Sequence, residues 1–203
     1  MELSVFIYGA SGHGKVVYEI TEALGLLLEV FVDDNEALQN KLGIPVVREI
    51  PNHLTQGVLA IGNNRLRKNI AKRFSTKKFV SLVHPNANIS PRSNLGSGSV
   101  VMAGATINAD VKIGSHVIIN TNASVDHDCI LEDFVHVSPN VALSGGVIIG
   151  EGTHIGIGAC VIPGVKIGKW VIVGAGAVIL KDIPDYAVVV GNPGKIIKNI
   201  FDE

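Results

Sequence analysis

Cysteine, aromatic residues and long apolar runs are all scarce in this sequence of 203 residues. Its two cysteines, Cys129 and Cys160, are too few for a disulfide framework. No apolar stretch approaches the roughly 20 residues that a membrane-spanning helix needs. The start of the chain runs straight into a strand-like segment, with no basic region or cleavage site ahead of it. We therefore expect a cytoplasmic protein that does not use a membrane as partner.

An excess of charge of either sign is also missing. The chain has 17 Lys and Arg against 18 Asp and Glu, which gives a net charge of -1. That balance gives no reason to expect nucleic acid or an anionic membrane surface as partner. What the chain does have is 23 glycines and 47% hydrophobic residues, which indicate many tight turns around a slim but substantial core.

A six-residue repeat fills the second half of the chain. Sixteen consecutive positions, six residues apart from Ile89 to Ile179, are all Ile, Leu or Val. The residue two places before each of these aliphatic residues is small. The aliphatic series is Ile89, Leu95, Val101, Ile107, Ile113, Ile119, Val125, Leu131, Val137, Leu143, Ile149, Ile155, Val161, Ile167, Val173 and Ile179. Residues two apart on a strand share a face, so both sets point inward. The repeat predicts a parallel β-helix over residues 84–203, with three six-residue sides per coil.

Three further expectations follow from the repeat. Glycines recur at or near the turns, where a positive φ costs them little, and these are Gly96, Gly114, Gly150, Gly168 and Gly174. Both cysteines read as packing residues. Apolar residues also stand at outward positions, as at Val100, Ile118 and Ile172, and such stripes suggest contacts between subunits.

The first half reads as a small Rossmann-like α/β domain over residues 1–83. A buried strand, Ser4–Tyr8, leads into a Gly-rich loop and a helix that reaches to about Leu24. Two further strands, Glu29–Val32 and Val58–Ile61, precede a helix at Arg65–Phe74. We expect three or four parallel strands, with the ligand at their carboxyl ends.

Three short segments stand at those carboxyl ends. The first is Ser11-Gly12-His13, the second is Asp33-Asp34, and the third begins at Gly62. A strand, a Gly-rich turn and a helix start together form a cradle for an anion or a nucleotide. The glycine spacing is GxxGxG rather than the dinucleotide GxGxxG, so NAD is disfavoured.

The whole chain resembles the bacterial nucleotide-amino-sugar N-acetyltransferases of the hexapeptide-repeat family. This family includes the UDP-4-amino-sugar acetyltransferase of the bacillosamine pathway and related sialic-acid O-acetyltransferases. The matching stretches, in order, are IYGASGHGKV, FVDD, AIGNNRLRK, HPNANI, IINTNASVDHDCILEDFVHVSP and GNPGK. The resemblance implies a left-handed β-helix, which the spacing alone does not show. It also implies a homotrimer with active sites between adjacent β-helices, acetyl-CoA in the groove, and a nucleotide-sugar on the N-terminal domain.

The resemblance also assigns residues. It implies that His127 is the general base, that Asp128 raises its basicity, and that Asn120 is a site asparagine. For acetyl-CoA it implies His136, Gly145, Ile157 and Ala175. For the nucleotide-sugar it implies Ser11, Gly12, His13, Asp33, Asp34 and Gly62. The family member compared has Glu where this chain has Asp128, so Asp126 is an alternative partner for His127.

The chemistry supports the base independently. A sugar amine is mostly ammonium at pH 7 and cannot attack a thioester until it loses a proton. A neutral imidazole with a pKa near 6.5 is a suitable acceptor, and a neighbouring carboxylate raises its basicity. His127 lies in a turn two residues after an inward aliphatic, so it should point away from the core. Cys129 points inward, which disfavours a covalent acyl-enzyme.

Other functions stay open at this point. Within enzymes the main rival is O-acetylation of a sialic-acid-like sugar. From other classes, the solenoid could be a scaffold, or it could bind zinc through His136 and His154, which lie 18 residues apart and should stack on neighbouring coils. We expect no metal. The sequence does not choose between UDP, GDP and dTDP, and it does not name the sugar.

Overall fold

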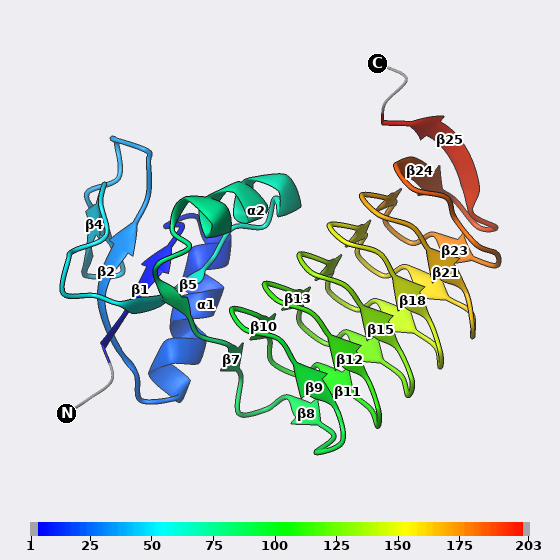
Figure 1. Ribbon diagram of the computed structural model, residues 1–203, viewed down its shortest axis with the longest axis horizontal. Helices are drawn as coiled ribbons and strands as arrows, with labels where there is room; N and C mark the ends of the chain where they lie inside the picture. The colour runs from blue at the N-terminus through cyan, green and yellow to red at the C-terminus, as the bar shows by residue number, and fades with distance from the viewer. Residues whose placement is uncertain (1–3, 201–203) are drawn as a thin grey trace.

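The computed structural model describes residues 4–200 and shows an α/β domain at one end of a long β-helix (Figure 1). The N-terminal elements are β1 (Ser4–Tyr8), α1 (Gly12–Ala23), β2 (Leu27–Val32), β3 (Asn40–Lys41), β4 (Ile44–Val47), β5 (Gln56–Leu59), α2 (Asn64–Arg73) and β6 (Lys78–Phe79). The sheet order is β3-β4-β2-β1-β5-β6, parallel except for the antiparallel β3. The predicted Rossmann-like arrangement is present, with five parallel strands rather than three or four.

The two helices cover opposite faces of this sheet. Val17 and Ile20 of α1 pack with Val5 and Ile7 of β1, while Ile70 of α2 packs with the alternate residues of that strand. Glycine is required where α1 meets the first loop, because a Cβ on Gly14 would lie 2.2 Å from the carbonyl oxygen of Gly9. The Gly-rich loop is therefore pinned between the sheet and the helix start.

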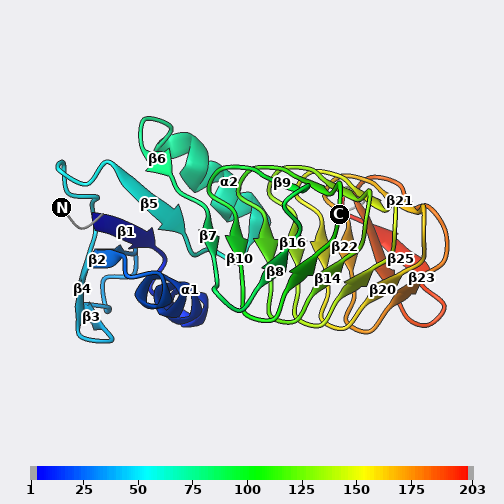
Figure 2. The same ribbon diagram turned by 90° about the horizontal axis from the view of Figure 1, so that it is seen from below.

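The β-helix has three flat sides, each a sheet built mainly of parallel two-residue strands (Figure 2). The first side holds β7 (Leu82–Val83), β10 (Val100–Val101), β13 (Ile118–Ile119), β16 (His136–Val137), β19 (His154–Ile155), β22 (Ile172–Val173), β24 (Ala187–Val190) and the antiparallel β25 (Lys195–Asn199). The second side holds β8 (Asn88–Ile89), β11 (Thr106–Ile107), β14 (Ser124–Val125), β17 (Ala142–Leu143), β20 (Cys160–Val161) and β23 (Val178–Ile179). The third side holds β9 (Asn94–Leu95), β12 (Lys112–Ile113), β15 (Ile130–Leu131), β18 (Ile148–Ile149) and β21 (Lys166–Ile167).

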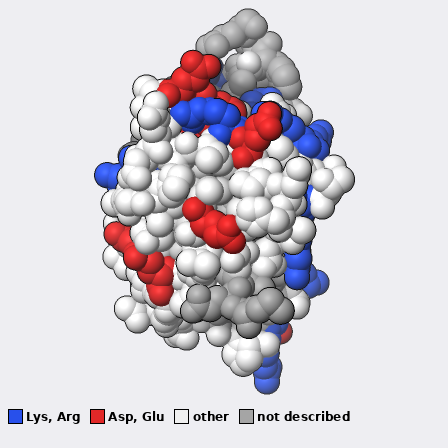
Figure 3. Space-filling view, turned by 90° about the vertical axis from the view of Figure 1, so that its left-hand side faces the viewer, with Lys and Arg blue, Asp and Glu red and all other residues white. Residues whose placement is uncertain are grey.

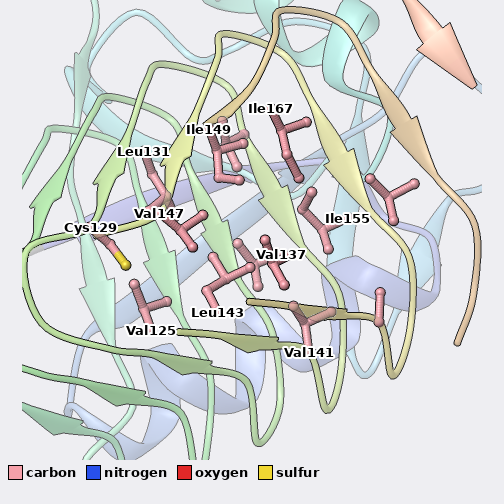
Figure 4. Packing of buried hydrophobic residues seen from close by; sticks show 14 of the residues in the cluster. Val125, Cys129, Leu131, Val137, Val141, Leu143, Val147, Ile149, Ile155 and Ile167 are labelled. Carbon is pink, nitrogen blue, oxygen red and sulfur yellow. The ribbon is translucent and has the colours of Figure 1, made fainter. Parts of the chain in front are cut away.

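The six-residue repeat gives the core as predicted. The strands pair with partners 18 residues along the chain, for example Val100 with Ile118, and the inward aliphatic and small residues form one continuous cluster (Figure 4). The left-handed β-helix expected from the resemblance is confirmed. Cys129 lies in this core, but the expectation for Cys160 was wrong. It takes the first, outward position of β20 and is exposed.

The reason given for the turn glycines was also wrong. Gly96, Gly114, Gly150, Gly168 and Gly174 do not have positive φ. Instead a Cβ there would collide with the adjacent coil; at Gly96 it would lie 2.4 Å from the backbone of Gly114. The positive φ falls two residues later in each turn, from Gly98 to Gly176, at residues that include Asp128 and Trp170. The five glycines from Gly96 to Gly174 are therefore needed because the coils stack closely there, and not because the backbone is left-handed.

The outward apolar stripe has a different partner from the one expected. Val100 and Ile118 are each 1% exposed because they pack under α1 and its strands, in one cluster with Val17 and Ile20. Of the three stripe residues named, Ile172 alone remains exposed. The first side of the β-helix is thus a domain junction, so the stripe is no argument for subunit contacts.

The domain boundary lies slightly earlier than residue 83. Phe79 ends the last strand of the N-terminal sheet, and Leu82 and Val83 already pair with Val100 and Val101 in the β-helix.

At the end of the molecule formed by the N-terminal domain, acidic and basic side chains are interspersed over a largely uncharged surface (Figure 3). Neither helix of the described residues is long and apolar enough to cross a membrane.

Candidate functional site

His127 lies in the turn between β14 and β15, at the corner where the second and third sides meet. Its side chain is 61% exposed, and its Nδ1 lies 2.7 Å from Oδ2 of Asp128. The hydrogen bond with Asp128 is the largest cause that raises the pKa of His127, and the charge of Asp126 adds to it. With Nδ1 bonded to the carboxylate, Nε2 is the nitrogen available to take a proton from a substrate.

The two candidate carboxylates have different tasks. Asp128 contacts the imidazole directly, one methylene shorter than Glu yet within hydrogen-bond distance. Asp126 instead accepts from the backbone N–H of His127 at 2.8 Å and from Nδ2 of Asn108 at 2.8 Å. These hydrogen bonds, with that from Asn108 the larger, lower the pKa of Asp126. Asp128 thus pairs with the ring, and Asp126 holds the backbone of the turn.

Gly145 lies one coil above His127, at the same corner. A Cβ on Gly145 would lie 2.6 Å from Cε1 and 2.8 Å from Nε2 of His127. The imidazole therefore rests on the bare backbone of Gly145. The resemblance grouped Gly145 with the acetyl-CoA residues; within one chain it lies beside the base.

His136 lies on β16, at the junction of the two domains, and is 8% exposed. Its Nδ1 lies 3.3 Å from the carbonyl oxygen of Gly62, and its Nε2 lies 3.2 Å from Nδ2 of Asn120. A carbonyl only accepts and an amide nitrogen only donates, so the neutral tautomer with the proton on Nδ1 satisfies both contacts. His136 thereby connects the loop after β5 to the β-helix.

Burial keeps the histidines of the junction neutral. It lowers the pKa of His136 to about 3, assisted by His154 and Arg67, and that of His13 to about 4. The rings of His136 and His154 stack with centroids 4.7 Å apart, as their spacing predicted. Nε2 of His13 is buried without a hydrogen-bond partner among the described residues, and its ring lies 6.4 Å from that of His136.

The other nucleotide-sugar candidates surround the start of α1. Ser11 and Gly12 are exposed there, where Ser11 makes no side-chain cap. Asp33 accepts from the backbone N–H groups of Ala10 at 2.7 Å and Asn35 at 2.9 Å, and Asp34 accepts from the hydroxyl of Tyr8. Both carboxylates therefore also stabilise the loops at this edge of the sheet.

The predicted residues fall into separate groups within one chain. Within one chain, Asn120 lies with His136 on the first side. Ile157 and Ala175 are both exposed at the corner between the first and second sides. His127 occupies the corner opposite the first side. One chain therefore does not bring its base next to its own His136, Ile157 and Ala175.

Sequence reasoning missed several residues at the junction. Arg67 is 1% exposed and donates to carbonyl groups of both domains. His116 stacks on Phe134, with ring centroids 5.1 Å apart, beneath α2. Nδ2 of Asn64 donates to the carbonyl oxygen of Gly152 at 3.0 Å. For His116 and Phe134 the sequence does hold a signal, since a spacing of 18 residues places both rings at the same corner of neighbouring coils.

The geometry gives no support to a zinc site. Nε2 of His136 is engaged with Asn120, and Nε2 of His154 lies 2.8 Å from the hydroxyl of Ser138. Within residues 4–200 no group of three or more His, Cys, Asp or Glu is placed to hold a metal ion. A pocket of about 150 Å³ does lie beneath the start of α2, lined among others by Gly62, Asn63 and His154.

Comparison with known proteins gives consistent matches. Residues 4–74 match the PglD N-terminal domain, and residues 146–181 match the bacterial transferase hexapeptide repeats. A UDP-N-acetylbacillosamine N-acetyltransferase from Bacillus subtilis is 41% identical over 113 residues, 49% of this chain and 51% of that relative. The chain thus matches about half the length of this curated relative.

Solved structures match over nearly the whole chain, and two of them illustrate the likeness. One is a mutant of perosamine N-acetyltransferase from Caulobacter crescentus in complex with CoA and GDP-perosamine. It is 43% identical with a TM-score of 0.92, and the match covers 97% of each chain. The other is the acetyltransferase domain of PglB from Neisseria gonorrhoeae in complex with acetyl coenzyme A. It is 42% identical with a TM-score of 0.91, over 97% of this chain and 100% of that one.

Proposed function

We propose that this chain, which belongs to the hexapeptide-repeat family of nucleotide-amino-sugar N-acetyltransferases, transfers the acetyl group of acetyl-CoA to the amine of a nucleotide-linked amino-sugar. The observation that carries the proposal is the exposed His127, whose Nδ1 bonds to Asp128 and whose Nε2 is free to accept a proton. It stands in a chain whose fold matches, over 97% of its length, a relative bound to CoA and GDP-perosamine.

The proposed reaction is a direct attack. The sugar ammonium first releases one proton to solvent. The neutral amine nitrogen then forms a bond to the thioester carbonyl carbon and passes a second proton to Nε2 of His127, and the C–S bond breaks to release CoA thiolate. The proton then passes from the imidazolium to the thiolate, which restores neutral His127. Asp128 stabilises the imidazolium between these steps. Cys129, two residues from His127 in the sequence, is not placed to carry the acetyl group, because it is buried and desolvation raises the pKa of its thiol.

The distribution of residues supports assembly as a homotrimer. His127 occupies one corner of the β-helix, while His136, Ile157 and Ala175 lie on or beside the opposite side. Two adjacent copies can bring these groups together if the corner of one meets the side of the next. Such a contact uses different surfaces on the two copies, and it closes into a ring of three for a prism of threefold outline. Light scattering at micromolar concentration should give three times the chain mass, and a monomeric mass would contradict the trimer.

The two substrates are expected to divide between the domains. We assign the nucleotide-sugar to Ser11, Gly12, His13, Asp33, Asp34 and Gly62. We assign acetyl-CoA to the β-helix at His136, Gly145, Ile157 and Ala175. Asp33→Ala should therefore raise KM for the nucleotide-sugar by about 10-fold or more, since a charge-assisted hydrogen bond is worth about 1.5–3 kcal/mol. A rise in KM for acetyl-CoA instead would show that the substrates are assigned to the wrong domains.

The test of the function is a substrate panel. The protein is incubated with acetyl-CoA and UDP-, GDP- or dTDP-linked 4-amino-sugars, and free CoA is measured with a thiol reagent. The matched controls are the corresponding 4-hydroxy sugars, which report O-acetylation, and a sialic acid. Release of CoA with an amino-sugar and not with its hydroxy analogue supports the proposal. Turnover on the hydroxyl compounds alone would favour the O-acetyltransferase.

A further inference from the structure

Arg67 is a buried cation that is held entirely by carbonyl groups. It lies on α2 and is 1% exposed, and no carboxylate of residues 4–200 forms an ion pair with it. Its Nε donates to the carbonyl of His116 at 2.9 Å, and its two terminal nitrogens donate to Ile61 and Phe134, each at 2.8 Å. A buried charge without a counter-ion is costly unless hydrogen bonds compensate it, and here they come from fixed backbone atoms.

Two of those carbonyls, of Ile61 and Phe134, lie beside the two halves of the proposed site. Ile61 and Gly62 form the loop after β5, where the nucleotide-sugar is assigned, and Gly62 is a second, longer contact of Arg67 at 3.4 Å. Phe134 lies two residues before His136, on the coil that presents it to the same Gly62. One planar guanidinium therefore sets the position of both partners of the Gly62–His136 hydrogen bond.

The charge of Arg67 acts on the same group of histidines. Burial is the main cause that lowers the pKa of His13, His116, His136 and His154, and the Arg67 charge contributes at each of them. Burial lowers the pKa of Arg67 itself to about 9, so it remains a cation at neutral pH. A neutral His136 can donate from Nδ1 and accept at Nε2, whereas a protonated one would lose the acceptor for Asn120.

We propose that Arg67 is a positioning residue that fixes the nucleotide-sugar loop at Gly62 relative to His136, so that the two substrates meet in the correct geometry. This inference rests on the proposed function. Lysine cannot replace this fork, because a single ammonium group does not reach three carbonyls in one plane. Misplacement of reacting groups by about 1 Å can cost about 100-fold in rate, even when each substrate still binds.

The neighbouring Lys68 provides a matched control. It crosses the same junction from α2, pairs with Glu151, and lies 5.2 Å from the ring centre of Trp170 and 5.9 Å from that of Phe134. Among the hydrogen bonds of the described residues, none joins Lys68 to Gly62 or to the carbonyl groups just before His136. Lys68→Met should therefore weaken the junction without changing how the two halves of the site are aligned.

The experiment measures kcat and separate binding constants in wild type, Arg67→Lys and Lys68→Met. A nucleoside diphosphate and CoA, each added alone, serve as binding probes in calorimetry. For Arg67→Lys we expect kcat at saturation to fall by about 10- to 100-fold while both dissociation constants stay within threefold. For Lys68→Met we expect a lower Tm with an unchanged kcat. A purely structural role for Arg67 predicts that its variant behaves as Lys68→Met does, and that result would overturn the proposal.

Two further measurements keep the test decisive. Wild-type turnover is established first, so that failure on every amino-sugar counts against the proposed function and not against Arg67. If Arg67→Lys does not fold, the guanidinium N–H signals of wild-type Arg67 are followed by NMR. They should be protected from solvent exchange and should shift when either binding probe is added. Signals that exchange freely, or that respond to neither probe, would overturn the proposal.

Discussion

Two histidines nine residues apart on the same β-helix have opposite environments. His127 stands exposed at a corner, where Asp128 and Asp126 raise its pKa. His136 lies buried beneath the N-terminal domain, where desolvation, with His154 and Arg67 adding to it, lowers its pKa to about 3. The backbone conformation is nearly the same in every coil. The chemistry of an outward side chain on this fold is therefore set by what covers it rather than by the repeat.

The largest effect on kcat is expected when the exposed imidazole is removed. His127→Ala should lower kcat by roughly 100- to 10,000-fold, the usual contribution of a general base. The fold should remain intact, because the side chain is mainly in solvent. Circular dichroism and light scattering serve as controls beside the kinetic measurement. Near-normal turnover in the folded variant would remove His127 from the mechanism.

A smaller effect is expected from Gly145→Ala. The added Cβ would lie within 3 Å of Cε1 and Nε2 of His127, so the imidazole must swing away from its place. Gly145 does not have positive φ, so alanine is compatible with its backbone. We expect kcat to fall by roughly 10- to 100-fold with little loss of stability. In a His127→Ala background the same substitution should cause no further fall in kcat, and an additive fall in kcat would mean that Gly145 acts independently of the base.

The buried histidines should make stability fall in acid. His13 and His116 stay neutral in the folded protein down to a pKa of about 4, while in the unfolded chain they take up protons near pH 6.5. The unfolded state thus binds more protons in this window, so the free energy of unfolding falls as pH drops from about 6.5 to about 4. The limit is about 1.4 kcal/mol per pH unit for each fully buried histidine, and less where solvent reaches the ring.

His116→Asn tests how much one of these histidines contributes to the loss of stability in acid. Asparagine tolerates the positive φ of 56° at this position but does not titrate. Denaturant unfolding at several pH values should show a shallower loss of stability between pH 6.5 and 4 than in wild type. The comparison concerns the slope, since the lost stacking on Phe134 lowers stability at every pH. Equal slopes would show that His116 does not resist protonation in the folded state.

The smallest expected change concerns the pH profile of the base. Asp128 is the first cause of the raised pKa of His127, so Asp128→Asn should move the acidic limb of kcat/KM to lower pH. The weaker base should also lower the plateau rate by several-fold. Asp126→Asn, which removes the second cause and a backbone hydrogen bond, should shift the limb less. A larger shift for Asp126→Asn would reverse the assignment of the two carboxylates.

The sequence predicted what depends on local spacing. The inward hexad positions, the turn at His127 and the stacking of His136 on His154 all follow from a count of six and 18 residues. The details that depend on contacts between distant segments were not predictable in this way. Arg67 on an amphipathic helix reads as solvated, and nothing near it in the sequence indicates the carbonyls of coils about 50 and 70 residues later. Val100 and Ile118 read as an exposed stripe for the same reason.

The last segment of the chain covers the open end of all three sheets. Ile183 bonds to Lys166 on the third side, β24 pairs with β22 on the first, and the backbones of Gly191 and Gly194 bond to Val178 on the second. An uncovered coil would be a template for another solenoid to continue the stack. This cover hinders the stacking of a further coil on the end, and the length of the rod is fixed by the number of repeats. Inserting 18 residues would lengthen it by one layer of about 4.8 Å and keep the covering segment in the same orientation, whereas inserting six would turn that segment by one side of the prism.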